Sequence, residues 1–217
     1  MGMFSQLAQG VDWSSMGQMI LRIAAVLLCL VIHEVSHGLA AYHLGDPTAK
    51  QSHRLSLNPL RHLDPFGLIM MIAVGFGWAK PVPVDPRYFR KPKQGMALTA
   101  LAGPVSNLLL ALLLLLFSRL IYDFAPYSDL WNLVFGFLLD TAVLSIGLGV
   151  FNLVPIPPLD GSKVLAAFLP DHAYFQLMRY ERYGMLLLIF LSFRGVGGGV
   201  ISAVINWVWN LFVNLIY

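Results

Sequence analysis

The residues of this sequence best suited to chemistry are two histidines and a glutamate in the stretch 31–38. His33 and His37 are four residues apart, so in a helix they project from one face, one turn apart. Two imidazoles at this spacing can hold one Zn²⁺, and Glu34 can reach a water on that ion, as in the His-Glu-x-x-His signature of zinc hydrolases. Ionisable groups inside an apolar run (19–41) are costly unless they are paired or bind a metal. The stretch therefore predicts a metal site rather than a chance match.

A third protein ligand is expected, because catalytic zinc usually takes three side chains and leaves one position open for water. Asp160 is one candidate, since it follows a proline-rich stretch and precedes a glycine, although an Asp there could instead cap a helix. Asp140 is the reserve carboxylate; it lies inside an apolar run, at a depth nearer the far side of the membrane. The other histidines are expected at a helix surface or in solvated polar loops: His43, His53, His62 and His172.

Composition indicates that these residues belong to a membrane protein. Of 217 residues, 58% are hydrophobic and 12% charged, whereas soluble domains have about 45–50% and about 25%. Several runs approach the roughly 20 apolar residues that cross a bilayer. The net charge of +3 is small, so the basic residues indicate topology rather than a surface for nucleic acid. The single Cys29 excludes an intramolecular disulfide and is expected to be a buried apolar residue.

The expected fold is an all-α polytopic membrane protein with about five transmembrane helices plus a membrane re-entrant β-hairpin or loop segment. We treat residues 1–217 as a single integral membrane domain. The expected spans are 15–44, 95–121, 130–154, 183–193 and 200–217. The domain then divides into the helix 15–44 with the histidine motif, the re-entrant region 46–94, two core helices in 95–161 that end in an Asp-Gly motif, and a C-terminal helical hairpin, 162–217.

The short apolar stretch 65–78 decides the predicted topology. If it crossed the membrane, the basic residues would divide between the two sides. If it dips in and returns, eleven of the 14 Lys and Arg residues lie on one side, as the positive-inside rule prefers. A re-entrant segment must be covered by protein or water, so it should line a cavity. We therefore expect a multi-pass protein of the cell membrane, with the motif histidines toward the cytoplasmic side.

Two sequence motifs resemble the signature motifs of the site-2 proteases, which are intramembrane zinc metalloproteases. The motifs are His-Glu-Val-Ser-His-Gly (33–38) and Asn-Leu-Val-Pro-Ile-Pro-Pro-Leu-Asp-Gly (152–161). Intervening segments are similar to the smaller bacterial and archaeal members, which lack PDZ and CBS domains: 56–59, 64–67, 77–84 and 103–107.

The resemblance implies a specific set of roles. His33, His37 and Asp160 would hold one Zn²⁺ per chain, and Glu34 would be the catalytic base. The substrates would be transmembrane proteins in the lipid bilayer, cut by regulated intramembrane proteolysis, with no nucleic acid as partner. A helical substrate hides its carbonyl groups, so it must unwind locally before it is cut.

Further residues could assist this reaction. Asn107 and Asn152 could hydrogen-bond an unwound substrate or an oxyanion, or they could join neighbouring helices within the membrane. The stretch 74–84 could offer a strand edge to an extended substrate, or it could cover the site as a plug.

Two other functions remain open at the level of the sequence. The chain could be a membrane transporter or sensor that binds a metal, or a catalytically dead scaffold for transmembrane helices. Glu34 distinguishes them, because a hydrolase needs this carboxylate as a base while a transporter would use it as one more ligand.

Overall fold

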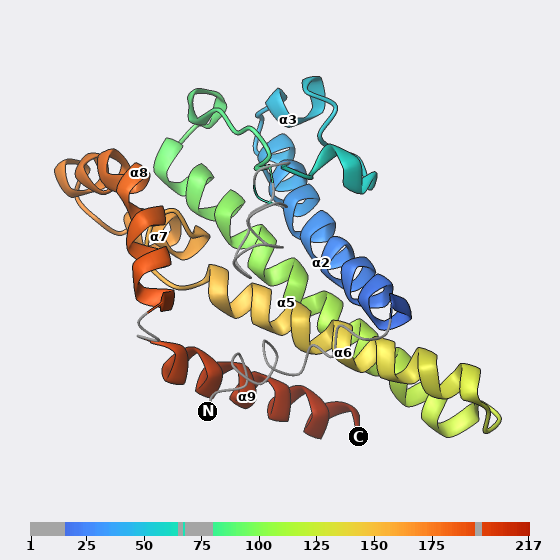
Figure 1. Cartoon of the computed structure of the whole chain (residues 1–217). Helices are drawn as coiled ribbons and strands as arrows, with labels where there is room; N and C mark the ends of the chain where they lie inside the picture. The colour runs from blue at the N-terminus through green and yellow to red at the C-terminus, as the bar shows by residue number, and fades with distance from the viewer. Residues whose placement is uncertain (1–15, 65–66, 68–79, 194–196) are drawn as a thin grey trace.

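The computed structural model describes residues 16–64, 67, 80–193 and 197–217, and these residues are mostly helical (Figure 1). The long helices are α2 (Met16–His43), α5 (Pro92–Phe124), α6 (Asp129–Asn152), α8 (Asp171–Phe193) and α9 (Gly198–Ile216). The short ones are α3 (Thr48–Gln51), α7 (Asp160–Ala166) and the 3-10 turns η1 (Pro59–Arg61) and η2 (Pro86–Tyr88). The described residues contain no β-strand, in keeping with the expected all-α class.

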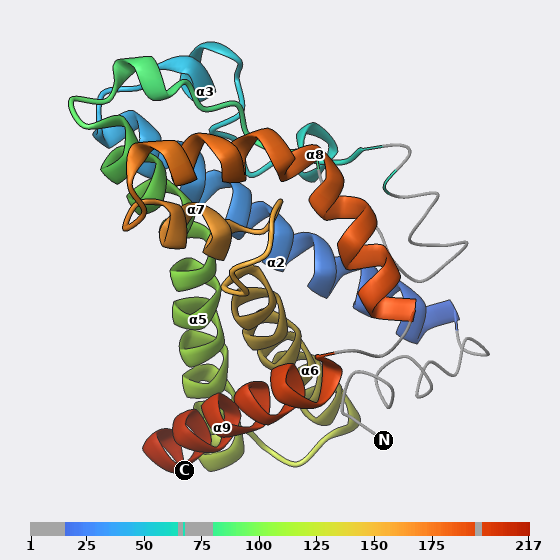
Figure 2. The ribbon, with the colours of Figure 1, turned by 90° about the vertical axis from the view of Figure 1, so that its left-hand side faces the viewer.

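Four helices of the described chain are long and apolar enough to cross a membrane, namely α2, α5, α6 and α9. The fifth expected span, 183–193, is not separate, because it is the second half of α8, which begins at Asp171. The prediction began this span at residue 183, after a polar stretch, but charged side chains do not stop a helix, and α8 begins directly after Pro170. Figure 2 shows that α8 bends along its length before the chain reaches α9.

The core of the bundle lies where α5 and α6 pack together and α9 crosses them (Figure 2). Gly149 of α6 allows the close approach, since a Cβ there would lie 3.0 Å from the carbonyl oxygen of Pro104. At the far end of α5, the Ser118 and Tyr217 hydroxyls are 2.7 Å apart. Helix α9 is thus held by α5 and α6.

The chain between α2 and α5 is tied together by two buried polar side chains. Asp46 accepts hydrogen bonds from the backbone N–H groups of Thr48, at 2.9 Å, and Asp85, at 2.7 Å. The guanidinium group of Arg54 donates to the carbonyl oxygens of Arg61 and Lys80. These bonds join the segments on either side of residues 65–79 at the end of α2.

Both flanks of the predicted re-entrant segment therefore lie on the same side of the bundle. The Lys80 N–H donates to the His62 carbonyl oxygen at 2.8 Å, so the chain leaves and returns at neighbouring points. The predicted re-entrant β-hairpin itself falls on 65–66 and 68–79, which are outside the described residues. The expectation that His62 is solvated is wrong. Its ring is buried, with Nε2 2.7 Å from the Ser56 carbonyl oxygen, because the loop folds back on itself.

Candidate metal centre

Two histidines of α2 meet a carboxylate from a distant part of the sequence, at the start of α7. His33 and His37 lie one turn apart on α2, and Asp160 is the first residue of α7. The Nε2 atoms of both imidazoles are 3.1 Å from the Oδ2 atom of Asp160. All three residues are buried, and the candidate ligand atoms lie within 4.8 Å of one another. In the described part of the chain this is the group suited to holding a metal ion.

Asp160 reaches the histidines because the chain doubles back after α6. Helix α6 ends at Asn152, and the proline-rich stretch that follows returns the chain so tightly that a Cβ at Gly161 would overlap the Leu153 carbonyl group. The carboxylate of Asp160 does not cap α7; its close contacts are with the two imidazoles, and Lys163 Nζ is more distant at 3.9 Å. The alternative role for Asp160, a helix cap, is therefore not the one that its side chain plays.

The three ligand atoms require a positive charge between them. The Nδ1 atom of His37 is 2.7 Å from the Thr99 carbonyl oxygen, which can only accept, so Nδ1 carries the proton. In a neutral ring, Nε2 then presents a lone pair to the Asp160 carboxylate. A carboxylate that faces the lone pair of His37 Nε2 is stable only with a cation or a proton between them.

Zinc fits this donor set. Two imidazole nitrogens and one carboxylate oxygen are ligands that catalytic zinc sites use, with bonds of about 2.0–2.2 Å. Tetrahedral ligands at these bond lengths are about 3.3–3.6 Å apart, and the Nε2–Oδ2 separations are slightly shorter, at 3.1 Å. The Thr99 carbonyl group orients His37 in the way that partners of metal-bound histidines commonly do.

Glu34 lies beside the ligand group and is held by the returning chain. Its Oε2 atom accepts a hydrogen bond of 2.9 Å from the backbone N–H of Val82. The side chain of Val82 is buried over Gly38, where a Cβ would lie 3.2 Å from the valine Cγ1. The segment 80–84 thus covers this face of α2 and fixes one oxygen of the carboxylate. The sequence left open whether the stretch 74–84 covers the site or offers a strand edge, and it did not predict the hydrogen bond to Glu34.

Gly103 of α5 belongs to the segment 103–107 that resembles the family, but its contact with the two imidazoles was not predicted from the sequence. A Cβ at this position would lie 2.5 Å from Nε2 of His37 and 2.7 Å from Nε2 of His33. A hydrogen atom is thus the largest side chain that fits beside the imidazoles. The signal available in the sequence was the spacing of small residues on α5, since Thr99 and Gly103 are one turn apart and face α2.

The other candidate residues stand apart from the three ligands. Asp140 is exposed on α6 and does not belong to the metal-binding group. Asn107 is fully buried near Gly149, and both polar atoms of its side chain lack a hydrogen-bond partner among the described residues. Asn152 is half-buried, and its Nδ2 atom donates to the Leu148 carbonyl oxygen at 2.9 Å.

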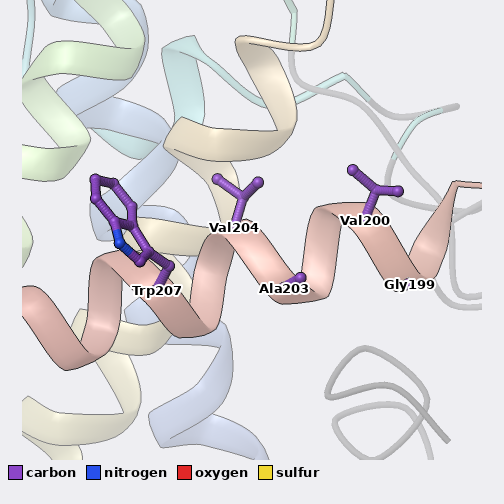
Figure 3. Close-up of a pocket in the computed structure, with 5 residues that line it drawn as sticks. All are labelled: Gly199, Val200, Ala203, Val204 and Trp207. Carbon is purple, nitrogen blue, oxygen red and sulfur yellow. The ribbon is translucent and has the colours of Figure 1, made fainter.

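An apolar hollow lies on the surface of α9 (Figure 3). Five residues line it, none of them titratable: Gly199, Val200, Ala203, Val204 and Trp207. The hollow therefore offers no group for the chemistry of the metal centre.

Comparisons with known proteins agree with the donor set. The profile described as "Peptidase family M50" matches residues 120–192, which include Asp160 but not the histidine motif. "Putative zinc metalloprotease YwhC" of Bacillus subtilis (strain 168) is 36% identical over 189 residues, which cover 85% of each chain. "Putative zinc metalloprotease Rip2" of Mycolicibacterium smegmatis is 34% identical over 185 residues, covering 82% of this chain and 68% of the relative.

A more distant relative is archaeal. "Putative zinc metalloprotease MJ0611" of Methanocaldococcus jannaschii is 32% identical over 149 residues, covering 67% of this chain and 69% of the relative. No solved structure matches this chain.

Proposed function

Because this chain belongs to peptidase family M50, the family of the site-2 proteases, we propose that it hydrolyses peptide bonds within or near transmembrane helices of membrane-anchored proteins. The observation that carries the proposal is the meeting of His33, His37 and Asp160 at 3.1 Å beside Glu34. A metal site alone would also suit a transporter or sensor. A carboxylate next to the ligands, itself outside the ligand group, favours hydrolysis.

In this proposal His33, His37 and Asp160 hold one zinc ion per chain. Zinc bound there would supply Lewis acidity, polarising a carbonyl group and lowering the pKa of water toward about 7. Glu34 removes the proton from the attacking water and delivers it to the leaving amine. The Val82 N–H holds Oε2 of Glu34, which leaves the other carboxylate oxygen to carry the proton. Thr99 keeps the proton of His37 on Nδ1, away from the ligand atom.

Asn107 and Asn152 differ in how accessible their side chains are to a substrate. Asn152 is half-buried at the end of α6, eight residues before Asp160, so an unwound substrate could reach its amide. Asn107 is fully buried between α5 and α6, so a substrate could reach it only if these helices separated. We therefore favour Asn152 as the donor to the substrate backbone or oxyanion, with Asn107 in a supporting position.

Cleavage of a membrane substrate by the purified protein tests the function. The protein is incubated with a library of single-span proteins in lipid vesicles, with and without a zinc chelator, and fragments are identified by mass spectrometry. We expect cuts within or next to the spans that stop with chelator and resume when zinc is restored. Zinc binding without any cleavage across the library would favour a transporter or sensor, and cleavage insensitive to chelator would contradict the proposal.

The proposed location is the cell membrane, with the metal centre toward the cytoplasm. Single cysteines at the exposed positions Ser52 and Arg90 should then react with an impermeant reagent only from the cytoplasmic side. A cysteine at Tyr127, in the exposed loop between α5 and α6, should react only from outside. The native Cys29 is buried and adds little background. Labelling of positions 52 and 90 from opposite sides would contradict this topology.

A further inference from the structure

A polar pocket beyond the end of α2 gathers positive charge without any counter-charge. Among the described residues, its lining includes Arg54, Arg61, Lys80 and His53, and no acidic residue. None of the ion pairs formed among the described residues includes Arg54, Arg61 or Lys80. The pocket thus presents three permanent positive charges before any protonation of the histidine. Positive charges gathered in one concavity repel one another and produce a positive potential there. Such a pocket therefore attracts an anion.

Arg54 is the unusual member of this group. Its side chain is 8% exposed, yet its guanidinium group meets only carbonyl oxygens, those of Arg61, Lys80 and Pro81. Its Nε atom is buried and has no hydrogen-bond partner in the described structure. A buried charge without a counter-ion is costly, and carbonyl dipoles compensate it only in part. An anion in the pocket would neutralise this charge.

The surroundings of the pocket select the kind of anion. Leu60 lines the pocket and is 75% exposed, and Leu57, three residues earlier in the chain, is 69% exposed. The pocket lies beyond the C-terminal end of α2, a helix long and apolar enough to cross a membrane. Positive charge next to exposed leucines, at the end of a helix of membrane length, suits a molecule that carries a phosphate group at one end and is apolar at the other.

We propose that this pocket binds the phosphate group of an anionic phospholipid. Arg61 and Lys80 are the exposed donors that contact the phosphate, and Arg54 supplies buried charge behind them. The same Arg54 holds the Lys80 and Pro81 carbonyl groups, directly before the Val82 N–H that binds Glu34. A bound headgroup would therefore brace the segment that covers the metal centre.

Lipid retention by the purified protein tests the pocket without relying on proteolysis. The protein in a zwitterionic detergent is titrated with phosphatidylglycerol or with phosphatidylcholine, and bound lipid is counted by native mass spectrometry. Arg54 is a poor target, because its loss could unfold the loop, whereas Arg61 and Lys80 have exposed side chains. The test variant is therefore Arg61→Gln with Lys80→Gln. Its matched control is Arg90→Gln with Lys91→Gln, which removes the same charge from exposed positions outside the pocket.

We expect one tightly retained phosphatidylglycerol in the unmodified protein and in the control, and no comparable retention of phosphatidylcholine. Loss of two basic contacts should weaken phosphatidylglycerol binding roughly tenfold or more. Equal retention by the test variant and the control would overturn the proposal, because binding would then depend on overall charge. So would equal retention of the two lipids.

A second arm separates a lipid from a soluble phosphate. Inorganic phosphate is added as a competitor, and Leu57→Ser with Leu60→Ser removes the apolar contacts. For a lipid site, inorganic phosphate competes only weakly, and the leucine variant loses phosphatidylglycerol while still binding inorganic phosphate. If inorganic phosphate displaces the lipid at similar concentration and the leucine variant binds normally, the site is one for a soluble phosphate and the lipid assignment fails.

Discussion

Replacement of Gly103 by alanine should disrupt the metal centre without disturbing the fold. The added Cβ would lie 2.5 Å from Nε2 of His37 and 2.7 Å from Nε2 of His33, whereas ordinary contact begins at 3.4 Å. An imidazole must therefore move by about 0.9 Å, or the helices must separate by that distance. Metal–ligand distances tolerate about 0.2 Å. Since the shift is several times larger, we expect zinc affinity to fall by about 100-fold or more.

The measurement is the zinc dissociation constant of the purified variant, determined by competition with a chromophoric chelator. The helix itself should be unaffected or slightly more stable, because alanine favours a helix over glycine by about 1 kcal/mol. The matched control is Gly136→Ala on α6, where a Cβ meets nothing within 4 Å. The control should keep full zinc affinity. If Gly103→Ala binds zinc as tightly as the control, the three proposed ligands do not hold the metal in the observed arrangement.

Two further substitutions test individual contacts. Asp160→Asn should lower zinc affinity sharply and abolish cleavage, because a neutral amide is a poor ligand. Asp140→Asn should keep the metal. If metal analysis gives the reverse pattern, Asp140 and not Asp160 is the ligand. Val82→Pro removes the N–H that Glu34 accepts and should lower kcat by roughly tenfold or more with zinc content unchanged. Val82→Ala keeps that N–H and should cleave nearly normally; equal kcat for the two Val82 variants would mean that the hydrogen bond does not position Glu34.

Much of this architecture follows from local patterns in the sequence. Apolar runs of membrane length predicted α2, α5, α6 and α9 to within a few residues. The spacing of His33 and His37 required a helix to bring both rings to one face, and α2 provides it. These features depend on neighbours within one or two turns, so composition and period suffice to predict them.

The features that the sequence did not reveal depend on contacts between distant segments. The hydrogen bond from Val82 to Glu34 joins residues 48 positions apart, and it exists because Asp46 and Arg54 hold the two flanking segments together. His62 is polar and lies in a polar stretch, so nothing local predicts its burial; the fold of the loop decides it. The requirement for glycine at position 103 likewise arises only when α5 packs against α2.

In the proposed function, Glu34 acts as the base beside a zinc ion that other residues hold. Its most direct test is the zinc content and the cleavage rate of Glu34→Gln, measured on one preparation in lipid vesicles. Glutamine keeps the size of the side chain and can still accept from the Val82 N–H, but it cannot take a proton at neutral pH. We predict about one zinc ion per chain, as in the unmodified protein, and no detectable cleavage. If the variant keeps both its zinc and its cleavage rate, Glu34 is not the base. If the variant loses its zinc, Glu34 is a metal ligand instead.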